Sequence, residues 1–179
     1  MFGTVKGDFE IAPEGPQAAV LADIVNLGVV PGYEGKPEHK VVFVFYSAEV
    51  GAKGNRLTIE NKVTLSMSRK ANCRKMVDGW RGKALTDEEA EKLDLMSLVG
   101  KPGFLNVVHQ AGSKGGLFAN ISSIMPLPKG IVVPTLEGYR RRDFSKQMGK
   151  GGEGTPAANG SSVPDSAPAG AGGDDDVPF

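Results

Sequence analysis

The sequence lacks the features that mark secreted and membrane proteins. It has a single cysteine, Cys73, which cannot form an internal disulfide and suits a reducing compartment. No apolar run approaches the about 18 residues of a membrane-spanning helix. The start of the chain, MFGTVKGDFE, has no basic segment followed by the apolar stretch of a secretory signal. We therefore expect a cytoplasmic protein with no membrane partner.

Catalytic and cofactor-binding motifs are also missing. The two histidines, His39 and His109, are too few and too distant to build a Cys/His zinc site with one cysteine. The sequence contains no P-loop, no G-x-S-x-G nucleophile motif and no H-E-x-x-H motif. The candidate carboxylates Asp23, Glu60 and Asp94 do not have metal-ligand spacing. The sequence thus predicts a protein that is not an enzyme and uses no cofactor or metal.

Charges of both signs are abundant, but they are unevenly distributed. The 179 residues carry 21 Lys+Arg and 21 Asp+Glu, which gives a formal net charge of zero. Residues 1–150 hold all 21 basic side chains and 16 acids, a net charge of +5, whereas residues 151–179 hold five acids and no basic residue. Of these last 29 residues, 19 are Gly, Pro, Ala or Ser, so the segment is too poor in apolar residues to fold. This pattern indicates a cationic body followed by a disordered anionic C-terminal tail.

Apolar patterning predicts five strands. Residues 40–46, KVVFVFY, are mostly β-branched and aromatic. Residues 56–68 place apolar side chains at every second position except Asn61, which is typical of a half-buried antiparallel strand. The other strands are expected at residues 18–27, 104–109 and 117–125.

Helical periodicity replaces alternation after the third of these strands. Residues 73–80 place Cys, Met, Val and Trp on one stripe of a helix expected over residues 69–80. A second helix is expected from Thr86, because T-x-x-E is a capping box. Three strands, helices and two strands is the order of an oligonucleotide/oligosaccharide-binding (OB) barrel. We therefore predict a mainly β fold, a five-stranded OB-fold barrel with a helical insertion between the third and fourth strands, although another antiparallel α+β fold would give the same order of elements.

Composition divides the chain into three parts. Residues 1–137 form the expected OB-fold domain, residues 138–173 a basic and then Gly/Pro/Ala/Ser-rich disordered linker, and residues 174–179 an acidic tip. The basic stretch contains Arg140, Arg141 and Arg142, which either extend a cationic surface or simply begin the linker.

We interpret the tip as a ligand for another protein, carried on a flexible linker. A phenyl ring and a terminal carboxylate can enter a small apolar pocket rimmed by Lys or Arg, and aspartates can steer them there. The alternative is a tail that only increases solubility, but a block of like charges at the end of a disordered segment is more typical of a segment that binds a partner. The expected partner-binding residues are Asp174, Asp175, Asp176, Val177, Pro178 and Phe179.

These six residues, DDDVPF, resemble the D-D-D-I-P-F tip that ends bacterial single-stranded DNA-binding proteins. The body is instead similar to OB-fold single-stranded DNA-binding proteins encoded by bacteriophages, in W-R-G-K at 80–83, T-D-E-E at 86–89, LNVVH and ANISSI. The resemblance implies a protein that coats and protects single strands during DNA replication, recombination and repair, and whose tip recruits replication and repair enzymes. It assigns no individual DNA-contacting residue, and it places the protein in the bacterial cytoplasm if it is phage-encoded.

Candidate DNA contacts follow from physical chemistry, since binding single strands requires cations for phosphates and aromatic faces for bases. If Phe43 and Phe45 are core residues, the alternate positions of their strand face outward. A register slip of one residue would bury Phe118, the best candidate for an exposed aromatic. The candidates are Lys40, Tyr46, Lys53, Arg56, Lys62, Arg69, Lys70, Arg74, Lys114 and Phe118.

Two functional hypotheses remain. The first is a non-catalytic single-stranded DNA-binding protein, with which a homo-oligomer or a cooperative assembly on DNA is compatible. In this case the acidic tip is expected to compete with DNA for the cationic body, since the two parts carry opposite charge. The second is an OB-fold adaptor of a replication or recombination complex that binds proteins and has no affinity for DNA.

Overall fold

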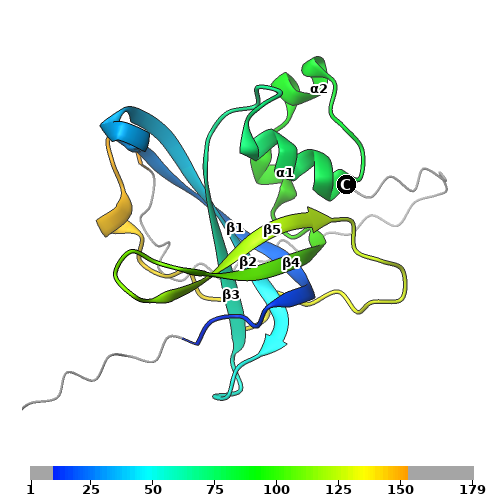
Figure 1. Cartoon of the computed structure of the whole chain (residues 1–179). Coiled ribbons are helices and arrows are strands. Elements are labelled where there is room, and N and C mark those ends of the chain that lie inside the picture. The colour runs from blue at the N-terminus through cyan, green and yellow to red at the C-terminus, as the bar shows by residue number, and fades with distance from the viewer. Residues whose placement is uncertain (1–9, 153–179) are drawn as a thin grey trace, which may run out of the picture.

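The computed structural model describes residues 10–152, which contain one antiparallel sheet with the strand order β3-β2-β1-β4-β5 (Figure 1). The prediction of a mainly β protein with five strands is confirmed. Within the described residues no ladder joins β3 to β5, so the sheet is not closed and differs in this respect from the predicted barrel. The predicted tip, and the linker beyond residue 152, lie outside the described residues. The strands are β1 (Gly15–Pro31), β2 (Pro37–Val50), β3 (Arg56–Thr64), β4 (Pro102–Ala111) and β5 (Leu117–Met125).

The helical insertion between β3 and β4 has the predicted stripe and cap. In α1 (Asn72–Arg81) the side chains of Cys73, Val77 and Trp80 are buried, and Gly82 ends the helix with a φ of 68° that favours glycine. In α2 (Asp87–Lys92) the Thr86–Glu89 capping box forms. The 3-10 helix η2 (Leu95–Leu98) completes the insertion. No helix of residues 10–152 is long and apolar enough to cross a membrane.

Strand β1 bends the sheet because it is shared between two partners. Residues 15–20 pair with β4, and residues 19–31 pair with β2. Two register shifts interrupt the pairing with β2, and such bulges bend and twist a strand. The β4–β5 hairpin therefore crosses the β1–β2 hairpin (Figure 1). The core lies inside this bend, where Phe45 packs edge to face on Trp80 with ring centroids 5.6 Å apart.

The outer face of β1 and β2 is covered by residues 138–152, which we call the strap. Phe144 of the strap is buried against Val25 and Leu27 of β1 and Val42 and Val44 of β2. The strap lies beside the β1–β2 hairpin in Figure 1, drawn in orange. Both faces of β2 are apolar, and one of them packs into the core. The other face needs a cover, because exposed β-branched residues would leave a large apolar surface in water.

The end of the strap joins the sheet. A bridge pairs Lys150 with Val29, and the Lys150 carbonyl accepts a hydrogen bond of 2.9 Å from the Val29 N–H. This approach requires glycine at two positions, since a Cβ at Gly28 would lie 2.4 Å from the Gly152 nitrogen and one at Gly149 would lie 1.9 Å from the Val29 oxygen. The folded unit thus extends past the predicted boundary at residue 137.

Candidate nucleic-acid interface

A groove runs between β3 and β5, the two edge strands of the sheet, whose Cα atoms approach within 8 Å. It consists of two cavities of about 580 and about 470 Å³. The first is lined by Thr58 and Glu60 of β3 and by residues 118–120 of β5, and the second by residues 61–63 and 121–124 together with α1. The lining residues of the two cavities follow one another along both strands, and we refer to the two cavities together as the β3–β5 groove.

Phe118 provides an exposed aromatic ring at one end of this groove. Its side chain is 58% exposed, so the predicted outward orientation is confirmed. The register is fixed by pairing with Gln110 of β4 and by Ala119 and Ile121, which pack against the core. Next to Phe118 on the same face, the Asn120 side chain donates a 2.6 Å hydrogen bond to Gln110. The ring lies against Gly112 of the turn between β4 and β5, and its exposed surface can stack on a planar ligand.

Three cations lie close together on the β3 side of the groove, where Arg142 lines the first cavity and Lys62 the second, whereas Lys40 lies on β2 and lines neither. Lys62 of β3 lies close to Lys40 of β2 and to Arg142 of the strap. Burial lowers the pKa of Lys62, the positive charge of Lys40 and that of Arg142 lower it further, and Glu60 opposes them. Lys40 pairs with Glu38 at 3.3 Å and Arg142 with Glu60, whereas no acid pairs with Lys62 in the described structure. We call Lys40, Lys62 and Arg142 the cationic cluster.

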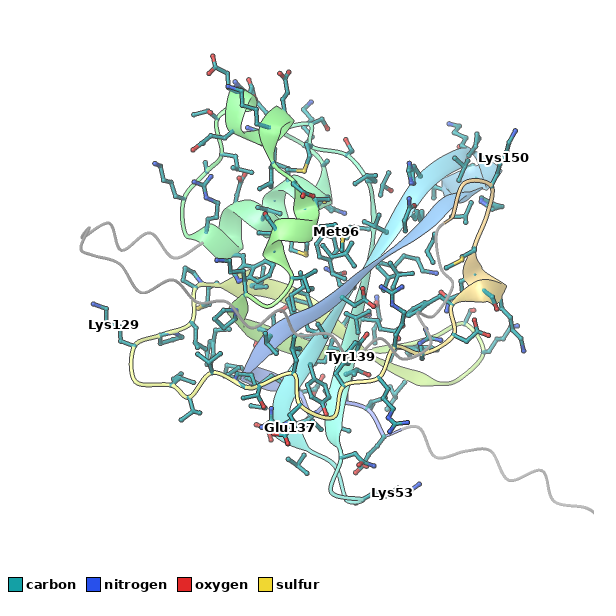
Figure 2. The ribbon with its side chains drawn as sticks, turned by 180° about the vertical axis from the view of Figure 1, so that it is seen from behind. Lys53, Met96, Lys129, Glu137, Tyr139 and Lys150 are labelled. Atoms are coloured by element: carbon teal, nitrogen blue, oxygen red, sulfur yellow. The ribbon has the colours of Figure 1, made fainter. Side chains whose placement is uncertain are left out.

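Four predicted contacts lie on the periphery. Lys114 is exposed in the turn between β4 and β5, beside Phe118. Lys53 is exposed in the turn between β2 and β3, and Figure 2 places it at the opposite end of the molecule from Lys150. Lys70 is exposed just before α1. Arg56 lies over the Tyr46 ring and donates a 2.9 Å hydrogen bond to the Thr135 carbonyl.

Tyr46 lies on the predicted face, opposite Phe43 and Phe45, but the expectation that it is exposed is wrong. Its side chain is only 7% exposed, because Tyr139 of the strap packs against it with ring centroids 5.7 Å apart. Burial also raises the pKa of the Tyr139 hydroxyl, and the Asp23 carboxylate raises it further. Figure 2 shows Tyr139 over the strands of the sheet. Tyr46 therefore packs the strap and offers no face to a base.

Arg74, another predicted DNA contact, is engaged within the protein. Its side chain is buried, and its guanidinium donates to the carbonyls of Met67 and Leu85 and to Asp87. Arg69 is exposed but shares the same carboxylate, at 2.5 Å. The pKa of Asp87 is held well below its usual range by Arg69 and then by Arg74. These arginines tie the segment before α1 to the start of α2.

Sequence reasoning did not resolve Arg142 as a groove residue. Arg141 and Arg142 are adjacent in a segment assigned to the linker, but they point to different partners, Asp23 and Glu60. The signal that could have separated them is the apolar spacing of the strap, since Tyr139 and Phe144 flank the arginines and anchor the segment.

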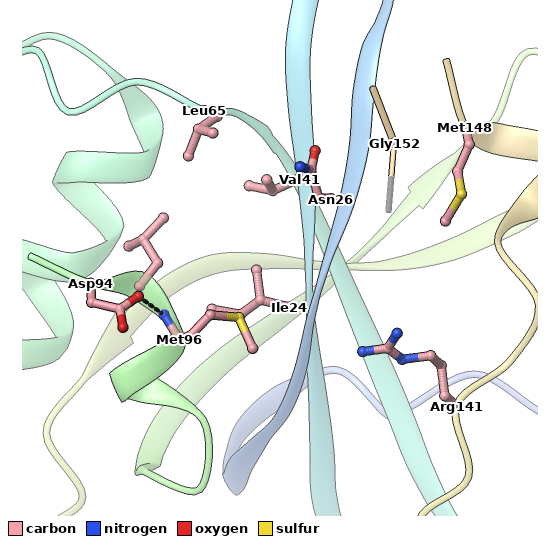
Figure 3. Close-up of a pocket in the computed structure, with 10 residues that line it drawn as sticks. Ile24, Asn26, Val41, Leu65, Asp94, Met96, Arg141, Met148 and Gly152 are labelled. Atoms are coloured by element: carbon pink, nitrogen blue, oxygen red, sulfur yellow. Dashed lines mark hydrogen bonds between the residues drawn. The ribbon is translucent and has the colours of Figure 1, made fainter. Parts of the chain in front are cut away.

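A larger cavity, about 930 Å³, lies elsewhere, between β1, η2 and the strap (Figure 3). Its polar groups are already engaged: Asp94 accepts a 2.9 Å hydrogen bond from the Met96 N–H, and Asn26 contacts His39 at 2.7 Å. Arg141, on its wall, pairs with Asp23. This cavity shares no lining residue with the β3–β5 groove, and the carboxylate of Asp94, which forms no ion pair within residues 10–152, would repel a phosphate.

The described residues contain no group of three or more His, Cys, Asp or Glu side chains placed to hold a metal ion. Cys73 is buried, and burial raises the pKa of its thiol, which makes it a weak nucleophile. No protein-family model and no curated protein matches the chain. The arrangement of the β3–β5 groove is thus the main guide to function.

Proposed function

We propose that this protein is a non-catalytic single-stranded DNA-binding protein of the bacteriophage type. The observation that carries the proposal is the β3–β5 groove, which has the exposed Phe118 ring at one end and is lined by Arg142 and Lys62 of the cationic cluster. Stacking on an aromatic ring contributes about 1–3 kcal/mol per base, and cations bind the phosphates between bases. A groove of this kind accepts unpaired bases, whereas a duplex hides their faces.

The topology supports an OB-type fold in its partly open form. Strand β1 pairs with both β2 and β4, the helices follow β3, and β3 and β5 lie side by side as unpaired edges. OB folds bind oligonucleotides on the face of the second and third strands and between the loops after the first and fourth strands. In this chain β3, one wall of the β3–β5 groove, is the third strand, and the turn at residues 112–116 is the loop after the fourth.

In this proposal the protein coats and protects single strands during DNA replication, recombination and repair in the cytoplasm of a bacterial host. The tip at residues 174–179 recruits partner enzymes through its acids and its phenyl ring. The sequence of the tip and its resemblance to bacterial single-stranded DNA-binding proteins support this part.

The test is a titration of the full chain with fluorescent oligo-dT of about 30 nucleotides, followed by anisotropy at several salt concentrations. We expect binding whose affinity falls steeply with salt, and weaker binding to duplex DNA of the same length. RNA of the same sequence shows whether the groove distinguishes the two sugars. The proposal would be overturned if the folded protein did not bind single-stranded DNA in a buffer of low salt concentration.

A protein adaptor is the second candidate, favoured by one observation. The segment between β5 and the strap exposes a run of aliphatic residues, of which Val132 is 84% exposed and Val133 47%. Exposed apolar runs of this kind often mark protein-binding sites. Under this alternative, Val132→Ser with Val133→Ser abolishes partner binding, and the oligonucleotide titration shows no binding at any salt concentration.

A further inference from the structure

The ion pair between Arg142 and Glu60 lies on the wall of the β3–β5 groove. Two nitrogens of the guanidinium contact two oxygens of the carboxylate, with Nη2 and Oε2 2.6 Å apart. The Arg142 side chain is 50% exposed and that of Glu60 28%, so the pair is open to solvent. Both residues line the same cavity as Phe118.

The neighbouring pair, Arg141 with Asp23, differs in its exposure to solvent, because the Asp23 side chain is only 8% exposed. This exposure determines whether the arginine can exchange its carboxylate for another anion. A buried carboxylate cannot lose its partner without a large free-energy cost, whereas an exposed pair contributes only about 0–1 kcal/mol. A guanidinium that holds a carboxylate through two parallel hydrogen bonds presents the same geometry to a phosphate. Arg142 can therefore change partners, and Arg141 cannot.

Arg142 keeps its place without Glu60. Its guanidinium carbon lies 4.3 Å from the centre of the Phe144 ring, and Phe144 is itself buried against β1 and β2. The Arg141–Asp23 pair and the Lys150–Val29 bridge hold the strap on either side. The Glu60 contact is thus not needed to anchor the strap, and its main effect is to neutralise a cation in the groove.

We infer that Arg142, Lys62 and Lys40 form a subsite for a backbone phosphate of the nucleic acid, and that Glu60 occupies this subsite when no ligand is bound. On binding, a phosphodiester replaces the Glu60 carboxylate on Arg142. Glu60 is thus a built-in competitor that weakens binding, and this inference rests on the proposed function. The three cations have three acids close by, Glu60, Glu38 and Asp143, so that displacing Glu60 leaves an excess of one positive charge facing the phosphate.

The test compares Glu60→Gln with Glu91→Gln in the full chain, using labelled oligo-dT at low salt. Glu91 is exposed on α2 and lines none of the cavities of the β3–β5 groove, so its replacement makes the same change in net charge away from the site. We expect Glu60→Gln to tighten binding about threefold to fivefold, in keeping with the contribution of an exposed ion pair. We expect Glu91→Gln to change the affinity by less than about twofold.

Arg142→Gln supplies the second half of a double-mutant cycle. We expect it to weaken binding and to reduce the slope of log affinity against log salt by about 1, as for the loss of one phosphate contact. Adding Glu60→Gln to this variant should have no further effect. Arg142→Lys, which keeps the charge but loses the two parallel hydrogen bonds, should fall between the wild type and Arg142→Gln.

Three results would overturn the inference while leaving the proposed function intact. One is equal tightening by Glu60→Gln and Glu91→Gln, which would reduce the effect to net charge. Another is an equal gain in affinity when Glu60→Gln is introduced into the wild type and into the Arg142→Gln variant. Glu60 would then only repel phosphate and would not compete for Arg142. The third is loss of urea stability in Glu60→Gln large enough to unfold the strap. Failure of the wild type to bind single strands would instead refute the proposed function.

Discussion

At the scale of single residues, whether an outward-facing side chain of the sheet is exposed depends on whether the strap covers it. Phe118 and Tyr46 were both expected to face outward, and both expectations rested on strand alternation. Phe118 does face outward, because β5 is an edge strand with one covered face. Tyr46 is buried because a second layer, which alternation cannot reveal, covers its strand. Alternation thus predicts which residues share a face, but not whether that face meets water.

Phe118→Ala should weaken binding to oligo-dT by about 1–3 kcal/mol, the contribution of one stacked base. The unfolding midpoint in urea should hardly change, because the ring is 58% exposed and leaves no cavity. Leu117→Ala is the matched control, since Leu117 is equally exposed and precedes Phe118 in β5. Equal losses of affinity in both variants would argue against stacking on Phe118.

At the scale of elements, apolar patterning located the strands and α1, while their ends were set by tertiary contacts. Strand β5 has the predicted bounds. Strand β1 runs to Pro31, beyond the predicted end at residue 27, because Val29 and its neighbours pair with β2 across the turn at Tyr33–Gly35. The strap was assigned to a linker because it has little secondary structure and many charges. Its two aromatic anchors are significant only once an apolar outer face of the sheet is known.

The strap gives a stability prediction. Phe144→Ala should lower the free energy of unfolding by about 3 kcal/mol, since it removes a buried ring from the outer face of β1 and β2. A chain that stops at residue 137 should lose more, because Tyr139 and the Arg141–Asp23 pair go as well. Urea unfolding followed by far-ultraviolet circular dichroism measures both. A chain ending at 137 that is as stable as one ending at 152 would contradict this account.

The junction of α1 and α2 gives a pH prediction. The pKa of Asp87 is lowered from its ordinary value of 3.8, first by Arg69 and then by Arg74. Because the pKa of Asp87 is lower in the folded than in the unfolded protein, its charged carboxylate stabilises the fold at pH values above the ordinary pKa. This stabilisation is lost as the pH falls below the ordinary pKa towards the pKa of the folded state. Asp87→Asn should therefore be less stable than the wild type at pH 7, with a gap that narrows towards pH 2. Urea midpoints across this range measure the gap; a constant gap would contradict the assignment.

At the scale of the whole molecule, the two parts of the sequence carry opposite charge. Residues 10–152 contain 20 basic and 15 acidic side chains, a net charge of +5, and Arg142 and Lys62 of the cationic cluster line the groove. Deleting residues 174–179 should tighten binding to oligo-dT at low salt, because the removed acids compete with phosphate for the same cations. The gain should shrink as salt rises. Anisotropy titrations of the two chains at several salt concentrations measure this, and equal affinities at low salt would refute the competition.

The arrangement of the whole sheet was only partly predictable. Five strands and the helical insertion follow from local patterns. Whether β3 and β5 pair depends on the bend of β1, which two register shifts produce. The shift at Gly28, whose φ is 71°, has a sequence signature, since a glycine inside a strand indicates a bulge, but the shift near Ala22 has none. The groove exists because that last pairing is missing, so its location could not be derived from patterns along the chain.

The burial of Trp80 has a practical consequence for spectroscopy. It is the single tryptophan of the chain, it is 1% exposed, and its indole N–H donates a 2.7 Å hydrogen bond to the Pro102 carbonyl. Its emission should remain blue-shifted and poorly quenched by acrylamide, whether or not an oligonucleotide is present. Tryptophan fluorescence will therefore report the unfolding of this protein but not the binding of an oligonucleotide in the groove.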